Sequence, residues 1–237
     1  MGKGEIVMMK KVLLGLAALS CVSLAAEGTN VYLKAGADVF QKFDEVKYEG
    51  EKLNKDKGDD FGYELTVEVM REVYPNLELG LGLSYQDHGD PKSVSYSYVD
   101  DYGYKNGKYE VPGFKSVPLY VTAKYNFPVE GNIKPYLKAD LGYSFNSDNG
   151  DLKDNFIFGA TGVSGVSGVS GEEKYSTKVE NGLYYGIGAG AEYNNFIVDL
   201  MYKVNRAEIK VNDEGDRIKK DLDYSRVTLS VGYKFNF

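Results

Sequence analysis

His88 is the only histidine among the 237 residues of the chain, and it stands close to two carboxylates and a hydroxyl. Asp87 and Asp90 lie on either side of it, and Ser84 comes shortly before it. A histidine that contacts a hydroxyl and a carboxylate can activate a nucleophile for acyl transfer. However, any residue in such a polar segment has neighbours of this kind, and the sequence does not single out one hydroxyl as the nucleophile. We therefore expect no catalytic residue and a protein that is not an enzyme.

Two other patterns could bind a cofactor or a metal ion. Residues 186–190 read Gly-Ile-Gly-Ala-Gly, but these glycines keep a spacing of two and no helical pattern follows, unlike a dinucleotide-binding loop. The acidic clusters at 148–151 and 213–216 lack the spaced ligands of a calcium-binding EF-hand loop. We interpret the glycines as strand residues and the clusters as solvated turns, and we expect no cofactor and no metal site.

Charged residues recur on one face of the alternating segments described below. Six are basic and seven acidic, and this near-balance suggests pairing inside a confined interior. The set consists of Lys34, Asp38, Glu64, Glu68, Glu78, Lys124, Lys138, Asp140, Glu192, Asp199, Lys203, Arg226 and Lys234. A packed polar core is the favoured interpretation, and a narrow ion or water path lined by these charges is the alternative.

Eight segments of about ten residues alternate apolar and polar positions, a period of two that indicates β-strands with two different faces. They are residues 31–39, 61–69, 77–85, 117–127, 137–145, 183–193, 196–205 and 227–237. This is the length that a tilted strand needs to cross the apolar band of an outer membrane. The sequence therefore predicts an all-β fold, a transmembrane antiparallel up-and-down β-barrel of eight strands. The alternating Tyr-rich segment from Val94 to Tyr109 is expected to project beyond the membrane as a sheet; if it inserts instead, the barrel has ten strands.

The connections between these segments alternate strictly in length. Short turns lie at Pro75-Asn76, at 130–132 and at Asn194-Asn195, whereas long loops cover roughly 41–60, 87–113, 147–181 and 206–223. Outer-membrane barrels have short periplasmic turns and long external loops. The loop lengths therefore agree with the predicted barrel.

Alternation alone does not say which face points outward, because a lipocalin-like soluble barrel also alternates with its apolar face inside. Glycines crowd the polar face, and a narrow interior needs small residues: Gly36, Gly62, Gly80, Gly82, Gly142, Gly186, Gly188, Gly190 and Gly232. Aromatic residues gather near the ends of the apolar faces, as in the girdles of membrane barrels. These two observations favour an apolar outer face.

The first 26 residues have the order of a secretory signal peptide. Lys10 and Lys11 precede a short apolar run, and cleavage is expected after Ala25 or Ala26, which leaves residues 27–237 as a single outer-membrane barrel domain. Residues 1–7 add nothing to the signal, so Met8 or Met9 is the more natural start. An alternative is a lipoprotein acylated at Cys21, although Ala18 stands where that motif usually has leucine.

The predicted barrel resembles the small outer-membrane barrel family that includes the OmpA transmembrane domain, OmpX and opacity-type proteins. The resemblance rests on the architecture and on the last strand, where Tyr233, Phe235 and Phe237 fall on one face. It implies that these aromatic residues are the signal read by the outer-membrane assembly machinery. It also implies export through the inner membrane and residence in the cell outer membrane, in contact with its lipid.

Function is expected to reside in the loops. A net charge of −7 argues against nucleic acid as a partner. The loop at 147–181 contains a Gly-Val-Ser repeat over 162–171, and the loop at 87–113 contains alternating tyrosines. We expect a non-enzymatic, envelope-structural or adhesive protein that meets host or cell-surface ligands through these loops. The alternatives are a narrow porin-like channel or small-solute transporter and, less favoured, a lipid A-modifying enzyme that uses His88.

Overall fold

The computed structural model describes residues 28–48, 51–58, 60–99, 103–148, 150–160, 168–213 and 216–237. The predicted signal segment 1–26 and its cleavage residues Ala25 and Ala26 lie outside these ranges. All regular secondary structure in the described ranges is β. Within them, no helix has the length and apolar character that a membrane crossing requires.

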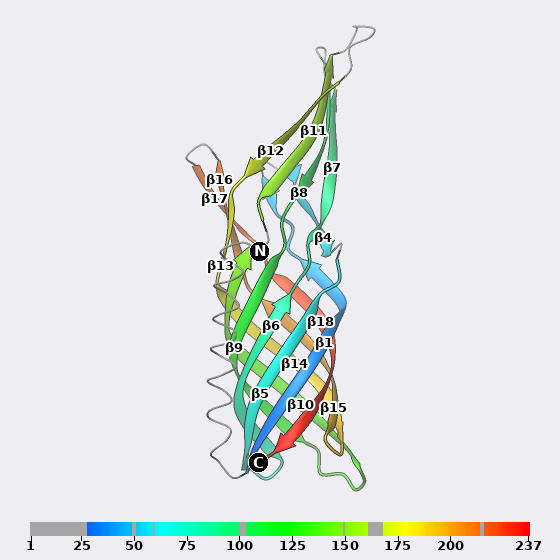
Figure 1. Cartoon of the computed structure of the whole chain (residues 1–237), viewed down its shortest axis with the longest axis vertical. Helices are drawn as coiled ribbons and strands as arrows, with labels where there is room; N and C mark the ends of the chain where they lie inside the picture. The colour runs from blue at the N-terminus through cyan, green and yellow to red at the C-terminus, as the bar shows by residue number, and fades with distance from the viewer. Residues whose placement is uncertain are drawn as a thin grey trace.

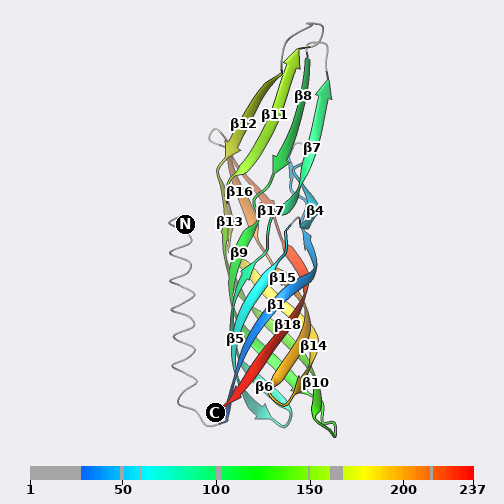
Figure 2. The same cartoon turned by 45° about the vertical axis from the view of Figure 1, so that its right-hand side comes forward.

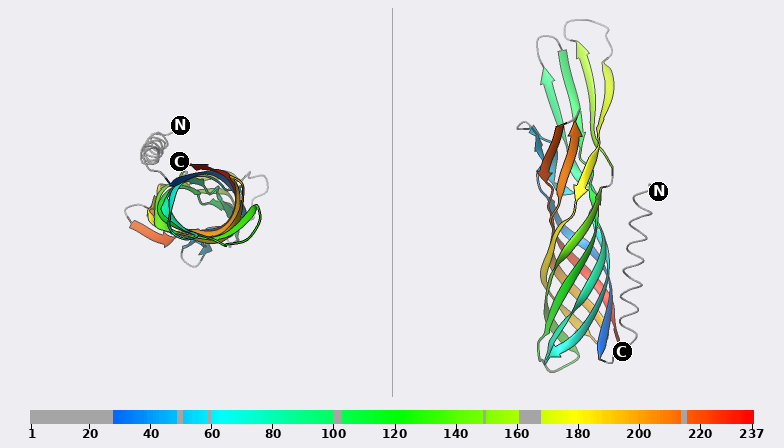
Figure 3. Two further views of the ribbon diagram at one scale, coloured as in Figure 1. Left: turned by 90° about the horizontal axis from the view of Figure 1, so that it is seen from below. Right: turned by 90° about the vertical axis from the view of Figure 1, so that its left-hand side faces the viewer.

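Eight antiparallel strands close into a barrel, in agreement with the predicted fold (Figure 1). The strands are β1 (Thr29–Phe43), β5 (Tyr63–Tyr74), β6 (Leu77–Asp87), β9 (Phe114–Asn126), β10 (Ile133–Asp148), β14 (Gly182–Tyr193), β15 (Phe196–Asn205) and β18 (Tyr224–Asn236). Each pairs with its neighbours along the chain, and β18 pairs with β1 from Asn30↔Asn236 to Phe43↔Tyr224. Seen along the barrel axis, the strands form a closed ring (Figure 3).

Short turns connect the strands at one end of the barrel, which we call the short-turn end. Asn76 and Asn194 have φ values of 67° and 55°, in the left-handed region that asparagine tolerates better than most residues. These two residues therefore allow the tight β5–β6 and β14–β15 connections. The backbone of Phe237 hydrogen-bonds to Gly28 and Thr29, so the last residue is held against the first strand.

The outer wall of the barrel is apolar and exposed. Its mid-strand residues include Leu65, Leu81, Val121, Leu141, Ile187, Leu200 and Val231, each 49–64% exposed. Aromatic residues mark both ends of this band, with Phe40, Tyr143 and Phe145 toward the long-loop end and Tyr125, Phe196, Tyr233 and Phe235 toward the short-turn end. An apolar band between two aromatic girdles is the outer surface of a transmembrane barrel.

The long loops fold into additional strands that extend the molecule beyond the barrel (Figure 2). One sheet has the order β12-β11-β8-β7-β4, a second β13-β16-β17, and a third consists of β2 and β3. The bounds are β2 (Lys47–Tyr48), β3 (Glu51–Lys52), β4 (Asn54–Gly58), β7 (Pro91–Val99), β8 (Gly103–Glu110), β11 (Leu152–Ala160), β12 (Val169–Tyr175), β13 (Thr177–Glu180), β16 (Glu208–Asp213) and β17 (Asp216–Asp221). We call these ten strands the extension. The hairpin β7–β8 belongs to it, as expected for a segment that projects beyond the membrane, and the alternative of a ten-stranded barrel is wrong.

Candidate functional site

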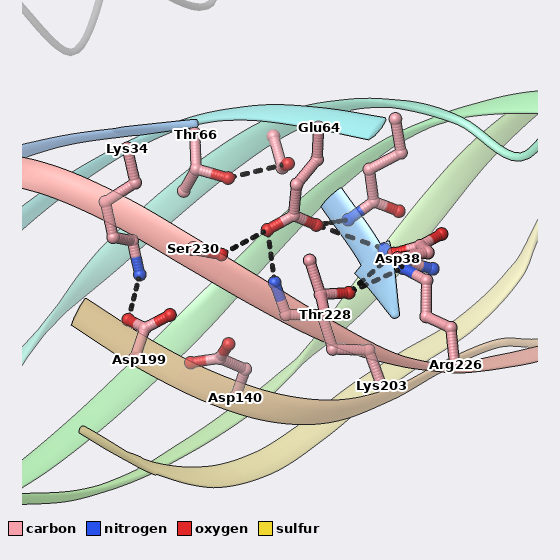
Figure 4. A network of polar contacts seen from close by, with 12 residues as sticks. Lys34, Asp38, Glu64, Thr66, Asp140, Asp199, Lys203, Arg226, Thr228 and Ser230 are labelled. Carbon is pink, nitrogen blue, oxygen red and sulfur yellow. Dashed lines mark hydrogen bonds and ion pairs between the residues drawn. The ribbon is translucent and has the colours of Figure 1, made fainter. Parts of the chain in front are cut away.

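The charged side chains on the inner wall form three layers, and the uppermost surrounds Arg226 (Figure 4). The Arg226 guanidinium is 3.3 Å from Asp38 and 3.2 Å from Glu64, and Lys203 also pairs with Glu64. Arg226 further donates a hydrogen bond of 2.6 Å to Asn205. Arg226 is 1% exposed, so its charge depends on these partners rather than on water.

The middle layer is built on Glu68. Lys34 and Lys138 both pair with Glu68, and they continue to Asp199 at 3.1 Å and to Asp140 at 3.0 Å, respectively. This layer therefore holds three carboxylates against two ammonium groups. Asp199 Oδ1 has no hydrogen-bond partner within the described residues.

The lowest layer lies near the short-turn end and is built on Glu78 and Glu192. Lys124 bridges the two carboxylates at 3.3 and 3.1 Å, and Lys234 reaches Glu192 at 3.0 Å. Glu78 also accepts a hydrogen bond of 2.7 Å from the hydroxyl of Tyr32. This layer opens into a polar hollow of about 330 Å³ at the mouth of the barrel, which leaves the side chain of Lys234 15% exposed.

Tyrosine rings and glycines fill the space between these layers. A Cβ atom on Gly82 would overlap the ring of Tyr120, and one on Gly190 would lie 2.5 Å from the ring of Tyr136. Both tyrosines are almost fully buried, and their hydroxyls hydrogen-bond to Glu68 and Asp199. The glycines are therefore required because the rings occupy the positions where their side chains would be.

An apolar cluster covers the charged interior at the long-loop end, and we call it the apolar cap. It consists of Phe43, Val46, Leu53, Val111, Phe114, Leu152, Val179, Ala207, Ile209, Leu222 and Tyr224, all 7% exposed or less. Tyr224 joins the two environments, because its ring lies 4.6 Å from that of Phe43 while its hydroxyl donates to Asp38. The cap connects the ends of the barrel strands to the extension.

His88 lies under this cap, and its partner is not one of the residues suggested by proximity in sequence. Its ring is 4.3 Å from that of Tyr224, and Nε2 is 2.8 Å from Ser116 Oγ. Asp87 instead pairs with Lys115, and Asp90 accepts from the backbone of Gly113. Burial, with a smaller effect of the Arg226 charge, holds the pKa of His88 well below its ordinary value. The Nδ1 atom has no hydrogen-bond partner in the described ranges, so no carboxylate there orients the ring.

The aromatic residues of the last strand lie on the outer wall at the short-turn end. Tyr233, Phe235 and Phe237 are 38%, 39% and 52% exposed, and the ring of Tyr233 is 4.9 Å from that of Phe235. They form part of the aromatic girdle at that end.

A family model described as the outer membrane protein beta-barrel domain matches residues 12–235, nearly the whole chain. The chain belongs to this family. As an outer-membrane β-barrel protein, it resides in the outer membrane, where its short turns face the periplasm and its extension stands outside the cell.

Relatives of this outer-membrane β-barrel protein include an uncharacterised protein, PM1543, of Pasteurella multocida strain Pm70. The two are 29% identical over 239 residues, which cover 96% of this chain and 98% of the relative. Among solved structures, Neisserial surface protein A is 17% identical with a TM-score of 0.42, over 88% of this chain and 98% of that one. Ail of Yersinia pestis, solved with the heparin analogue sucrose octasulfate, is 16% identical with a TM-score of 0.37, over 89% and 100%.

The charged residues of all three layers could be named from the sequence, whereas the apolar cap and Ser116 could not. All thirteen charged side chains lie on the inner wall, where the ion pairs described above join them. The cap residues come one or two at a time from the ends of β1, β9 and β18 and from the segments between barrel strands, so no sustained period reveals them. Ser116 pairs with Gln86 across β6 and β9 and thus lies beside the strand end that carries His88, but this register is known only from the structure.

Proposed function

We propose that this outer-membrane protein is a non-enzymatic platform, in which the barrel anchors a folded extension that contacts host cells or other cell surfaces. The observation that carries the proposal is the apolar cap, a packed core that fixes the base of the extension to the ends of the barrel strands. A loop that only closes the barrel needs no such core. A rigid extension loses less conformational entropy on binding than a flexible loop would.

The distal part of the extension also exposes apolar side chains that no function of the barrel requires. Tyr98, Phe158 and Val169 lie in one row on one face of the distal sheet, and Val99 and Ile157 lie on the other face; all five are 48–73% exposed. Apolar side chains that gather on an external surface often mark a site of protein contact. We infer that this distal surface carries the adhesive function.

Truncation at a single level of the sheet tests the proposal. Val94, Tyr109, Asp154 and Glu173 pair in one row across β7, β8, β11 and β12. Replacing 95–108 and 155–172 by short Gly-Ser turns at that row removes the distal sheet and leaves the apolar cap. We expect bacteria with this variant to lose attachment to cultured epithelial cells, while the barrel still shifts on unboiled gels. The matched control shortens the β16–β17 hairpin by replacing 211–218 with a turn of the same kind, and it should retain attachment. Equal attachment of the wild type, the truncated variant and this control would contradict the proposal.

The filled interior and the cap support a barrel that does not conduct, rather than the alternative of a narrow channel. Tyr32, Tyr120, Tyr136 and Tyr184 occupy the lumen together with the paired charges, and each is at most 3% exposed. In planar lipid bilayers we expect no steady unit conductance from the intact protein. Channels of reproducible size would overturn this part of the proposal.

Lipid A modification by His88 is not part of the proposed function, since the His88–Ser116 pair is buried and lacks an orienting carboxylate among the described residues. We expect the His88→Asn variant to leave the lipid A of the host strain unchanged. A change in lipid A structure that disappears with this variant would restore the enzymatic alternative.

For biogenesis, we propose that Tyr233, Phe235 and Phe237 form the signal for the assembly machinery. Phe237→Ser should then lower the amount of folded barrel in the membrane, measured by the gel shift of unboiled membrane fractions. Tyr98→Ser, at an equally exposed aromatic residue of the extension, should not. Equal amounts of folded barrel for both variants would contradict this role of the last strand.

A further inference from the structure

The strand β7 has an open edge over its outer two-thirds. On one side it pairs with β8 from Val94 to Val99. On the other side β4 pairs with it only at Ser93 and Pro91, and no other described residue pairs with that side. The backbone N–H and C=O groups that face away from β8 beyond Ser93 are therefore available to another strand.

The opposite edge of the same sheet is the strand β12, and this edge is protected against pairing with another strand. It carries Gly171, Glu172, Glu173 and Lys174, and charges of this kind prevent edge-to-edge pairing. The open part of β7 reads Val94-Ser95-Tyr96-Ser97-Tyr98-Val99, with no charge, no proline and no glycine. The nearby Lys52 is paired with Glu45 at 2.7 Å. Only one of the two edges is therefore suited to accept a strand.

The open edge is also held rigidly. The Tyr96 hydroxyl donates to Asp154 at 2.7 Å, two strands away, and its ring stacks on that of Tyr109 at 4.6 Å. The ring crosses Gly107, where it occupies the position that a Cβ would take. A hollow of about 360 Å³ lies along the strand, bordered by residues 94–98, Lys52 and Tyr109. An edge that is already ordered loses little entropy when a partner strand adds to it.

The sequence of this edge is nearly symmetric about Tyr96, which makes it complementary to itself in the antiparallel direction. In that arrangement Tyr96 faces Tyr96 of the second copy, Ser95 faces Ser97, and Val94 faces Tyr98. Aromatic pairs, hydroxyl pairs and aromatic–β-branched pairs are the cross-strand combinations that stabilise antiparallel sheets. The strand β7 is therefore suited to a second copy of itself.

The orientation of the protein in its membrane determines where that second copy must be. The strand β7 runs outward from the barrel, and this direction is the same for every copy in one membrane (Figure 2). An antiparallel pair needs the opposite direction, which only a copy anchored in a facing membrane supplies. One pair of short edges is a small contact, but many copies on two apposed surfaces act together through multivalency.

From these observations we infer that the open edge of β7 binds the β7 edge of a second copy on a facing membrane, so that the protein joins like cells to one another. This inference rests on the proposed adhesive function and specifies one partner for it. Extended peptides of other proteins, and copies within the same membrane, are the competing occupants of this edge.

Vesicle clustering with charge exchange tests the inference. The full protein is reconstituted into two populations of phosphatidylcholine vesicles with different dyes, and clustering is followed by energy transfer between the dyes. Wild-type vesicles should cluster. S95K/S97K places lysines opposite lysines, and S95E/S97E places glutamates opposite glutamates, so each alone should lower clustering about ten-fold.

Mixing the two double variants places a lysine of one copy opposite a glutamate of the other at both positions, and clustering should return. Ser170→Lys on β12 is the matched control and should cluster like the wild type, because that edge takes no part in the inferred pairing. The gel shift of unboiled samples shows that each variant is folded before it is compared.

Several outcomes would overturn the inference. These are absence of clustering by the wild type, clustering that neither double variant lowers, and failure of the mixed variants to cluster although both are folded by their gel shift. Binding of the same vesicles to epithelial cells is measured in parallel. If that binding persists while clustering is absent, only the pairing of like copies is overturned; if both are absent, the proposed adhesive function falls as well.

Discussion

The barrel and the extension bury opposite kinds of side chain. In the barrel, charged side chains such as Arg226 and Glu68 are inside and residues such as Leu200 are outside. At the base of the extension, Ile209 and Leu222 are inside, and Lys178 and Lys219 are at the surface. The surroundings explain the difference, because the barrel wall faces lipid and the extension faces water. An apolar surface is stable against lipid but is unfavourable in water. One chain therefore contains two cores of opposite polarity, which meet at Tyr224.

Breaking the charged core should have the largest effect. Arg226→Met leaves Asp38 and Glu64 buried without their shared partner, which should cost about 3–5 kcal/mol of barrel stability. The matched variant Lys234→Met removes one partly exposed charge at the mouth and should cost about 1 kcal/mol or less. Urea unfolding in lipid vesicles, followed by the gel shift, measures both. Equal losses for the two variants would mean that the interior charges do not act as a buried network.

Breaking the apolar core should have a similar or slightly smaller effect, confined to the extension. Leu222→Ala should lower the stability of the apolar cap by about 2–5 kcal/mol. Trypsin should then cleave the extension faster while the barrel keeps its gel shift. Ile157→Ala, at an exposed residue, should change the cleavage rate little. Simultaneous loss of the barrel in the Leu222 variant would show that the two cores fold as one unit.

A lysine substitution at two equally exposed residues distinguishes a surface that faces lipid from one that faces water. Leu200 and Ile157 are each 49% exposed, on the barrel wall and on the extension respectively. Leu200→Lys should cost about 2–4 kcal/mol, as expected for a lysine near the bilayer midplane. Ile157→Lys should remain within about 0.5 kcal/mol of the wild type. Urea unfolding in lipid vesicles measures both, and similar costs would contradict the assignment of Leu200 to the lipid-facing wall.

The smallest expected effect is a pH dependence at the boundary between the two cores. Burial lowers the pKa of His88 below its ordinary value of 6.5, so the unfolded cap binds a proton more readily than the folded one. The stability that His88 contributes is present above pH 6.5 and decreases as the pH falls, by at most about 1.4 kcal/mol per pH unit. Trypsin cleavage of the extension between neutral and mildly acidic pH measures this loss. His88→Phe should reduce its slope, and an unchanged slope would assign the pH dependence to other groups.

The barrel could be predicted from the sequence because its signal is local. Each strand of the wall alternates over about ten residues, and a period of two is readable within one segment. Most strands of the extension could not be predicted, because their pairing is long-range: Lys153 pairs with Glu110, and Val179 with Ile209. Their residues are mostly polar, so only the paired structure reveals them. Of the Gly-Val-Ser repeat, Val169-Ser170-Gly171 begins β12, and 161–167 lie outside the described residues.

A nitroxide accessibility measurement at three positions tests most directly whether one chain holds two cores of opposite polarity. Labels are placed at Leu200, Ile157 and the fully buried Met201, in a Cys21→Ser background and in lipid vesicles. We predict that the label at Leu200 collides with oxygen dissolved in lipid, the label at Ile157 with a water-soluble nickel chelate, and the label at Met201 with neither. Collision of the nickel chelate with the label at Leu200, or lipid-like protection at Ile157, would contradict the arrangement.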